Sequence, residues 1–565
     1  CLMYRLILIL IPLNLFGQSP LTSGFFNYEL TDRYEILSDT INNNIFSAVK
    51  PFSRKAVVQF ANTIKPLSKV DEFNKSYLLT DNFIFSQFKK THKPTLNKKK
   101  IFSVENSFVL VNRSDIKLTL NPILGLDIAF DKYDTLNTYR NSRGIELRGL
   151  IGEKVGFYSR IIENQVRFPN YTRRKNINSG VVNGSTLFKT INPYSRDFFN
   201  ASGYVVFAPV DEINIQFGQD NNSIGNGYRS LILSDFSAPY LFLKFNTKVW
   251  KFNYQNLFSK HVDYSRIINQ PPVDDIKEDL SGIPHKNKYS AFHHLSINVL
   301  KNLNIGFFEN IIFDRSDSTQ SNSYDVSYLN PLIFYTAVNH GLNSTDNAVV
   351  GIDWKWNFKN HFSFYGQFVL DEFKKDELFS RSQSWVNKWA YQGGLKYINV
   401  LNVSNLDMQL EVNQLRPYLY QHSDISQNWI HFNQSLSHPL GSNLREFIAI
   451  LRYQPLARLN FKAAFSHSIQ GIDTSLLSTN FGGNYLRSYE INQLGALNQA
   501  VPMFSGIKNM VTAFSIDAHY MVYHNLFLDA GLFIRKENNP TISERLNMIF
   551  RFGLRMNLTQ IDYRI

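Results

Sequence analysis

The sequence predicts an all-β membrane barrel with about eighteen antiparallel transmembrane strands and a small N-terminal helical segment in the periplasm. Three observations lead to this prediction. Apolar and polar residues alternate over long segments, short and long connections alternate between those segments, and aromatic residues make up 15% of the chain. The mean hydropathy is −0.23. Beyond the N-terminus no apolar run reaches the ~18 residues that a membrane helix needs, so helical membrane spans are excluded.

The clearest alternation lies near the C-terminus, over residues 546–558. Every second residue from Leu546 is apolar, and the residues between them include Arg551 and Arg555. Because a strand turns successive side chains to opposite faces, this segment has one apolar and one polar face. It is long enough to cross a bilayer as a tilted strand, which takes ~9–11 residues. The same pattern recurs at 350–358, 406–413 and 525–535, where the polar faces carry charged residues that suit a wet lumen.

The connections separate a membrane barrel from a soluble sandwich. Short breaks are expected near 152, 210, 248, 300–302, 359–360, 401–404, 455–456 and 523. Longer gaps are expected at 167–200, 219–236, 260–288, 314–345, 416–443 and 469–507. An outer-membrane barrel alternates tight periplasmic turns with long external loops in this way. The predicted even strand number puts both termini in the periplasm, and 102–112 is assigned to the periplasmic side.

The N-terminal part of the chain has a different character. Residues 1–17 are expected to be a secretory signal peptide, because Arg5 precedes a short apolar run and Gly17 follows it. Residues 18–100 are expected to form a helical periplasmic region and a basic linker, and residues 101–565 the barrel. Helices are predicted over 28–37, from a cap at Ser53, and from a cap at Asp71.

Charge and cysteine content limit the partners. The net charge of +13 favours anionic partners such as acidic polysaccharide or lipopolysaccharide. Nucleic acid is not expected, because the charges alternate along strands and no recognition motif is present. Cys1 is the only cysteine, so the sequence provides no intrachain disulfide.

Four groups of residues carry a resemblance to a known family. They are Asp32–Ile36 with Lys50–Lys55; Phe217–Asp220 with Gly225–Leu231 and Leu233–Asp235; Tyr328–Tyr335 with Asp346–Ala348; and Arg416–Tyr418, Tyr420, His422, His431–Gln434 and His438–Asn443. In this order they resemble the Wzi-type capsule-assembly barrels, in the branch that includes the gliding-motility protein RemB. The chain departs from the family pattern after Tyr335, where Thr336 and Asn339 replace an arginine and a glutamate.

The resemblance implies an outer-membrane barrel of about this strand number with a small periplasmic helical bundle, and a namesake that holds capsular polysaccharide at the cell surface. The candidate polysaccharide contacts are Asn226, Tyr228, Arg229, Asp235, Tyr328, Asn330, Asp346, Asn347, Arg416, Tyr418, Tyr420, His431, Asn433, His438 and Asn443. Aromatic rings can stack on sugars, and arginine can make charge-assisted bonds to an acidic sugar. The alternative is that these residues fold the loops inward and plug the lumen.

No cofactor, metal site or catalytic site is predicted. His422, His431 and His438 are nine and seven residues apart, which matches no compact zinc pattern. Asp407 and Glu411 would lie on one strand face about 13 Å apart, too far to act on one substrate bond.

The sequence thus predicts a non-enzymatic protein of the cell outer membrane. Its predicted role is the assembly or retention of capsule or exopolysaccharide, or else gliding motility and adhesion. Motility or secretion machinery is expected as a further partner. The alternative function is an outer-membrane porin or nutrient channel.

Overall fold

The computed structural model describes residues 26–85, 106–152, 154–264, 285–314, 324–335, 346–372, 384–473, 480–491 and 500–559. The predicted signal peptide, the basic linker, Thr336 and Asn339 lie outside these residues. Within them, no helix is both long and apolar enough to cross a membrane.

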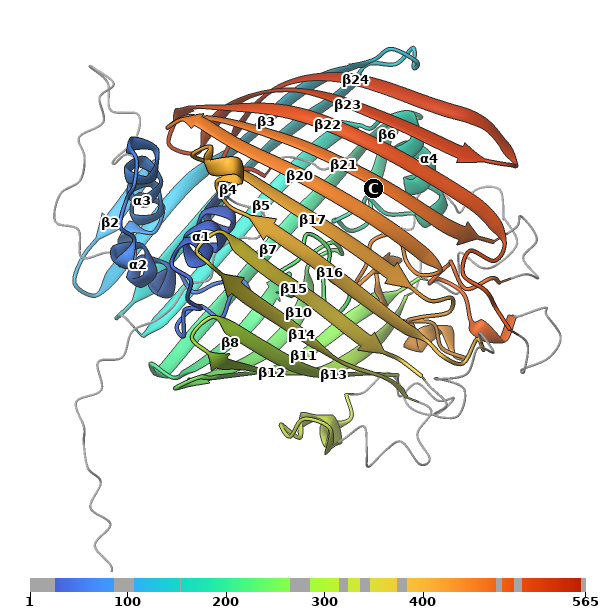
Figure 1. Ribbon diagram of the computed structural model, residues 1–565, viewed down its shortest axis with the longest axis horizontal. Helices are drawn as coiled ribbons and strands as arrows, with labels where there is room; N and C mark the ends of the chain where they lie inside the picture. Colours follow the sequence, from blue (N-terminus) through green and yellow to red (C-terminus); the bar gives the residue numbers. More distant parts are fainter. Residues whose placement is uncertain are drawn as a thin grey trace, which may run out of the picture.

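The described residues form a closed antiparallel barrel of eighteen wall strands, which confirms the predicted architecture (Figure 1). The strands are β3 (Ile116–Asp131), β4 (Thr138–Ile151), β5 (Val155–Arg167), β7 (Ser195–Val210), β8 (Ile213–Asp220), β10 (Tyr240–Val249), β11 (Phe252–Asp263), β12 (Lys286–Leu300), β13 (Leu303–Phe313), β14 (Asn347–Phe358), β15 (Phe362–Leu370), β16 (Trp389–Tyr397), β17 (Leu406–Leu415), β20 (Leu444–Leu456), β21 (Leu459–Ile472), β22 (Ile507–Tyr523), β23 (Leu526–Asn539) and β24 (Ile542–Met556). The barrel closes where β24 pairs with β3, from Ile549 opposite Asp131 to Met556 opposite Leu124. Closure leaves no exposed sheet edge in the membrane.

The two faces of the wall follow the predicted alternation. On β24, Phe552 is 60% exposed and points outward, whereas its neighbour Arg551 is 6% exposed and points into the lumen. Arg551 forms an ion pair with Asp517 of β22 at 2.9 Å. The outer face is therefore apolar and the inner face carries paired charges, as a membrane barrel requires.

The connections follow the prediction at one end of the barrel and depart from it at the other. All eight predicted short turns are present, for example 359–361 between β14 and β15. At the opposite end, β23 and β24 are joined by residues 540–541 alone, so long loops do not occupy every position there. A turn at this end has no required length, because closure of the barrel depends on strand pairing and not on the turns. The short strand β2 (Val109–Asn112) pairs with the first residues of β3, at the short-turn end.

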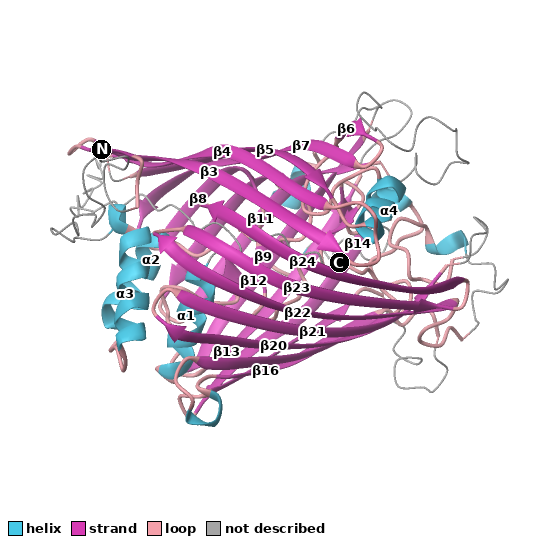
Figure 2. Ribbon diagram, turned by 90° about the horizontal axis from the view of Figure 1, so that it is seen from above, coloured by secondary structure: helices cyan, strands magenta, loops and turns pink. Residues whose placement is uncertain are grey.

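Three helices lie at the short-turn end of the barrel (Figures 1 and 2). They are α1 (Phe26–Leu37), α2 (Arg54–Thr63) and α3 (Lys69–Asp81). Ser53 caps α2 as predicted, by accepting a hydrogen bond from the N–H of Ala56. The cap of α3 is Ser68, and the prediction of Asp71 was wrong. The Asp71 N–H donates to Ser68 Oγ at 3.1 Å, as in a capping box, and the Asp71 carboxylate accepts from the Ser68 hydroxyl at 2.9 Å.

Candidate functional site

The lumen is occupied by folded protein, and this filling defines the candidate site. Residues 221–239, between β8 and β10, enter the barrel, and β9 (Ser223–Ile224) pairs there with β1 (Val49–Lys50) of the N-terminal region. Residues 416–443, between β17 and β20, enter as well and contain the hairpin of β18 (Ile430–His431) and β19 (Gln434–Ser435). Two loops and an N-terminal segment therefore meet inside the wall.

An apolar core holds these loops against the inner wall. The loops contribute Leu231, Leu233, Trp429 and Leu436, and the inner faces of the wall contribute Phe242, Leu257, Phe292 and Phe308. All of these side chains are buried. Burying a large apolar side chain contributes roughly 1.5–3 kcal/mol, so the loops are held as the core of a soluble domain would be.

Polar contacts fix residues 221–239 at named positions on the wall. The backbone N–H groups of Tyr228 and Arg229 donate to the Glu411 carboxylate at 2.6 and 3.0 Å. The Leu231 N–H donates to Gln367 Oε1 at 2.7 Å. These two N–H groups replace the water molecules that the Glu411 carboxylate lost when it was buried. Glu411 is thus a docking point for the loop.

Arg229 makes a second, charged attachment. Its Nε and Nη2 donate to the two carboxylate oxygens of Glu446 at 3.0 and 2.8 Å, and both side chains are buried. His438 Nε2 lies 2.9 Å from the same carboxylate. Burial lowers the pKa of His438 against the opposing effect of Glu446. The predicted contacts Arg229 and His438 therefore meet at one buried carboxylate.

Most other predicted contacts in residues 416–443 satisfy loop backbones. Tyr418 donates to the Asn480 carbonyl at 2.7 Å, and the Tyr420 hydroxyl donates to the Leu231 carbonyl. His431 Nδ1 accepts from the Val262 N–H at 3.0 Å. Further bonds join Arg416 to the Ser384 carbonyl at 3.0 Å, Asn433 to the Ser179 carbonyl at 3.0 Å, Asn443 to the Ser505 carbonyl at 2.9 Å, and Asn347 of β14 to the Gln427 carbonyl at 3.0 Å. Residues 221–239 and 416–443 together form a plug inside the barrel. The side chains named above are buried, so they form the interior of this plug and not an exposed binding face.

Tyr328, Asn330 and Asp346 lie elsewhere. Tyr328 is stacked on Phe313 with ring centroids 4.1 Å apart, and its hydroxyl donates to Asp346. The Phe313 side chain points away from the lumen, because it shares its face with outward residues of β13. The barrel wall thus separates Tyr328 from the lumen, whereas Asn347 of the same predicted group faces the lumen and bonds Gln427.

Helix α1 enters the short-turn end of the lumen and is held by ion pairs that sequence reasoning missed. The Lys355 ammonium of β14 lies 2.7 Å from Asp32 and 2.6 Å from Glu35. Lys396 of β16 also contacts Asp32, at 2.5 Å, and Arg33 pairs with Asp407 of β17. Burial alone would raise the pKa of Asp32, but Lys355 and Lys396 outweigh it and hold that pKa well below its usual value.

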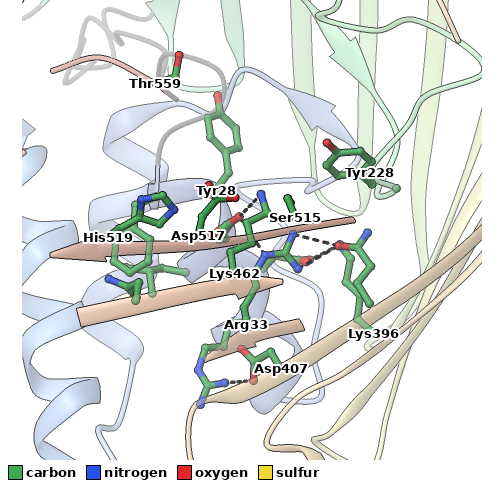
Figure 3. Close-up of a pocket in the computed structure, with 18 of the residues that line it drawn as sticks. Tyr28, Arg33, Tyr228, Lys396, Asp407, Lys462, Ser515, Asp517, His519 and Thr559 are labelled. Atoms are coloured by element: carbon green, nitrogen blue, oxygen red, sulfur yellow. Dashed lines mark hydrogen bonds and ion pairs between the residues drawn. The ribbon is translucent and has the colours of Figure 1, made fainter. Parts of the chain in front are cut away.

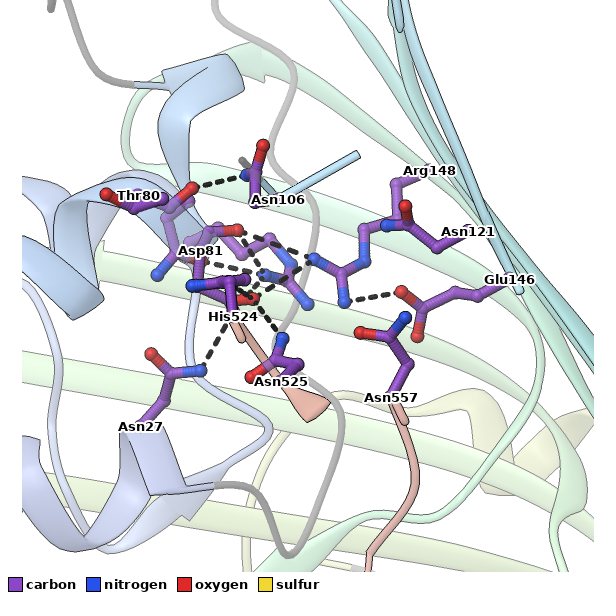
Figure 4. A network of polar contacts seen from close by, with 12 residues as sticks. Asn27, Thr80, Asp81, Asn106, Asn121, Glu146, Arg148, His524, Asn525 and Asn557 are labelled. Atoms are coloured by element: carbon purple, nitrogen blue, oxygen red, sulfur yellow. Dashed lines mark hydrogen bonds and ion pairs between the residues drawn. The ribbon is translucent and has the colours of Figure 1, made fainter. Parts of the chain in front are cut away.

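A buried network joins α3 to the barrel (Figure 4). Asp81, the last residue of α3, accepts from Asn27 at 2.9 Å and from Asn525 at 3.0 Å. Arg54 lies 3.3 Å and Arg148 of β4 3.8 Å from the same carboxylate. Burial would raise the pKa of Asp81, but Arg148, the bond to His524 and Arg54 hold it well below its usual value. Two carboxylates with lowered pKa values, Asp32 and Asp81, thus attach the helices to the wall.

These pKa shifts predict how the attachment responds to acid. A carboxyl with a lowered pKa stabilises the folded state above its unfolded pKa, about 3.9 for Asp, and loses that contribution as pH falls through the folded pKa. The helices are therefore expected to stay docked at about pH 4 and to detach only in stronger acid. Hydrogen exchange of residues 26–37 and 69–81 between about pH 2 and about pH 7 measures this. In the Asp32→Asn variant, the pH dependence of hydrogen exchange should become weaker in residues 26–37 and stay unchanged in residues 69–81. The same pH dependence in both segments would contradict the role given to Asp32.

A cavity of about 580 Å³ remains between residues 221–239, helix α1 and the inner faces of β16, β17 and β20–β24 (Figure 3). Four predicted contacts line it: Asn226, Tyr228, Arg229 and Asp235. Eight cationic side chains line it as well, namely Arg33, Lys50, Arg229, Lys396, Arg452, Lys462, Arg551 and Arg555. Five acids oppose them: Glu29, Asp32, Asp235, Asp407 and Asp517. The volume is that of a small-ligand pocket, and most of its cations are paired, for example Arg229 with Glu446 and Arg555 with Asp529.

A basic helix lies beyond this cavity, at the long-loop end. Helix α4 (Asn170–Ser179) carries Arg173, Arg174 and Lys175, and Tyr171 packs on Phe533, which lines the cavity. Burial, then Arg535 and Arg229, lowers the pKa of Lys175 to about 8. Three cations thus lie on one helix at the long-loop end, where Arg173 pairs with Asp134 at 3.0 Å. Among the described residues, no group of three metal-ligating side chains is placed to hold an ion.

A closed barrel with an apolar exterior and a polar lumen is typical of an outer-membrane β-barrel, and here loops of the chain fill the lumen. The comparison with solved structures agrees with this class. The chain is similar to Wzi of Escherichia coli, described as an outer-membrane protein involved in group 1 capsule assembly and as a carbohydrate-binding β-barrel. The TM-score is 0.56 at 13% identity, over 96% of this chain and 100% of that one.

Two further solved structures are also similar, at lower scores. OccAB2 of Acinetobacter baumannii has a TM-score of 0.41 at 11% identity, over 78% of this chain and 97% of that one. OprD of Pseudomonas aeruginosa has a TM-score of 0.41 at 9% identity, over 78% and 94%. No protein-family model matches the chain, and neither does any curated protein.

Proposed function

We propose that the protein is a non-enzymatic outer-membrane barrel that retains capsular or exopolysaccharide at the cell surface. The observation that carries this proposal is the apolar core that fills the lumen between β10 and β17, because a filled lumen suits a binding protein better than a channel. The likeness to a barrel described as carbohydrate-binding supports it further. The resemblance to the RemB branch adds gliding motility or adhesion as the competing role.

In this proposal the polysaccharide meets the long-loop end of the barrel, at α4. Arg174 and Lys175 are partly exposed there, beside Arg535 and Arg545. Arginine and lysine suit the carboxylates of acidic sugars. The cavity behind α4, with Asn226, Tyr228, Arg229 and Asp235, is the proposed site for a terminal sugar.

The sidedness behind this proposal has a direct test. Tyr194, in the turn before β7, and Leu401, in the turn before β17, are exposed at opposite ends of the barrel. Tyr194→Cys is expected to react with a membrane-impermeant maleimide on intact cells, and Leu401→Cys only after permeabilisation. Labelling of Leu401→Cys alone on intact cells would reverse the orientation.

The function is tested by deleting the gene and scoring cell-bound and shed polysaccharide together with colony spreading. Retention is expected to fall. Unchanged retention with lost spreading would reject polysaccharide binding and favour motility. With purified protein, the Arg174→Gln/Lys175→Gln double variant should bind an acidic polysaccharide about twofold to thirtyfold more weakly, because each of the two charge pairs contributes ~0.2–1 kcal/mol. The matched control is Lys301→Gln/Lys359→Gln, which removes two exposed cations from the short-turn end.

One observation favours the alternative, an outer-membrane porin or nutrient channel: the cavity of about 580 Å³ inside the barrel. Planar-bilayer recording separates the two functions. Steady large conductance steps would favour the porin, and their absence is expected from the filled lumen.

A further inference from the structure

The hairpin of β18 and β19 docks on the end of β11 through two hydrogen bonds to one residue of the wall. The Phe432 N–H donates to the Val262 carbonyl at 2.9 Å, and the Val262 N–H donates to His431 Nδ1 at 3.0 Å. His431 Nε2 lies 3.4 Å from the Pro239 carbonyl, which can only accept. In the docked hairpin, Nδ1 of His431 therefore carries no proton and Nε2 carries one, so the imidazole is neutral.

A second histidine, His261 of β11, lies beside His431. The two ring centroids are 5.4 Å apart, and both side chains are buried. His261 Nε2 lies 2.9 Å from Ser259 Oγ and 3.0 Å from Ser290 Oγ. Its Nδ1 is buried and has no hydrogen-bond partner within the part of the chain that the structure describes. A proton added to Nδ1 would be a buried charge without a partner, which is costly.

The surroundings of the two rings do not favour an added positive charge. Among the described residues, neither histidine forms an ion pair with a carboxylate, whereas His294, His438, His519 and His524 do. Asp263, two residues after His261, faces the Lys288 ammonium of β12 at 3.8 Å. Burial lowers the pKa of His431 to about 3, since the bond to the Pro239 carbonyl opposes burial only in part and Lys288 adds to it. The other titratable groups around the rings are Tyr240 of β10, Asp263 and Tyr264 at the end of β11, His285, Lys286 and Lys288 at the start of β12, and Asp424 of the loop 416–443.

We propose that His261 and His431 form an acid-sensitive latch, which releases the hairpin of β18 and β19 from the wall below about pH 6.5. When His431 is protonated, Nδ1 becomes a donor that faces the Val262 N–H, so the bond between them is lost. Release exposes both rings to water in the lumen, where a histidine takes up a proton readily. Acid therefore favours the released hairpin, because that state binds protons and the docked state does not. The latch consists of contacts within the chain, so it does not depend on which ligand the protein binds.

The latch responds to milder acid than the attachment of the N-terminal helices. A histidine that is neutral when docked contributes fully above its undocked pKa of about 6.5, and docking weakens about tenfold for each pH unit below that value. The carboxylates that hold α1 and α3 lose their contribution only below about pH 3.9. At about pH 5 the hairpin should therefore be loosened while α1 stays docked.

Hydrogen exchange of the full chain at about pH 7.5 and about pH 5 tests the latch. After correction for the intrinsic pH dependence of exchange, the protection of residues 430–435 should fall at least about thirtyfold at the lower pH. The protection of residues 26–37 should hardly change. Unchanged protection of 430–435 would overturn the proposal. So would an equal loss in 26–37, because the whole interior would then open and not the hairpin alone.

The His261→Gln/His431→Asn double variant separates the latch from other effects of acid. The Asn Oδ1 can accept from the Val262 N–H in place of His431 Nδ1, and neither new side chain titrates. The protection of 430–435 should then fall less than about threefold between the two pH values. The matched control is His467→Asn, which removes a histidine from the outward face of β21, where it bonds Thr512 at 2.9 Å. This control should keep the full fall in protection.

Heat-modifiable migration on a gel shows that each variant is folded. A full fall in protection that persists in the folded double variant would overturn the proposal, as would its loss in His467→Asn. If the double variant has already lost its hairpin protection at the higher pH, His431→Asn alone decides. It keeps the acceptor for Val262, so its fall in protection should be smaller than that of the unaltered chain, and an equal fall would reject the latch.

Discussion

The Lys355→Met variant is expected to release α1 from the lumen while the barrel wall stays intact. Lys355 and Glu35 are each 1% exposed at their side chains, and Lys355 also holds Asp32. Methionine leaves the Glu35 carboxylate buried without its cation, and breaking a buried ion pair from one side costs about 3–5 kcal/mol. Hydrogen exchange of residues 26–37 should therefore speed up at least about a hundredfold.

Lys55→Met is the matched control. Lys55 pairs with Asp211 at 2.8 Å at the same end of the barrel, but the Asp211 side chain is 54% exposed. Exposed pairs contribute ~0–1 kcal/mol, so exchange of 26–37 should hardly change. Equal exchange in the two variants would show that α1 is held by packing and not by Lys355. Trypsin cleavage after Arg33, which pairs with Asp407 when α1 is docked, gives an independent readout.

The barrel could be predicted because each wall strand repeats one local rule. Residues such as Phe550, Arg551 and Phe552 alternate between lipid and lumen, and this signal needs no knowledge of distant residues. The cap of α3 was assigned three residues too late, because Ser68 and Asp71 bond each other and both are good capping residues. The two-residue connection after β23 was also missed, because residues 540–541 carry no length constraint.

The lumen contacts could not be predicted, because they join residues far apart in the sequence. Lys355 meets Glu35 across 320 positions, and Arg229 meets Glu446 across 217. One signal was available: Phe292 and Phe308 make both faces of β12 and β13 apolar, which indicates strands covered on both sides. Glu309, a charge on the outward face of β13, similarly indicates a covered outer wall.

The Arg229→Met variant is expected to free residues 221–239 from the inner wall. The Glu446 side chain is 2% exposed and would keep its charge with only His438 beside it. Removing one partner of such a pair costs about 3–5 kcal/mol, so the loop should lose docking stability although Leu231 and Leu233 still pack in the core. Hydrogen exchange of 223–235 and, on the proposed function, weaker polysaccharide binding are the readouts.

A second substitution separates lost attraction from stranded charge. In the Arg229→Met/Glu446→Gln double variant no buried carboxylate is left uncompensated, and His438 can still bond the glutamine. Replacing both partners of a buried pair by neutral groups is often close to neutral, so most of the docking stability should return. The coupling between the two sites is then about 2 kcal/mol or more in a double-mutant cycle. If the double variant exchanges as fast as Arg229→Met, Arg229 acts through packing on Tyr228, whose ring lies 5.1 Å from the guanidinium, and not through Glu446.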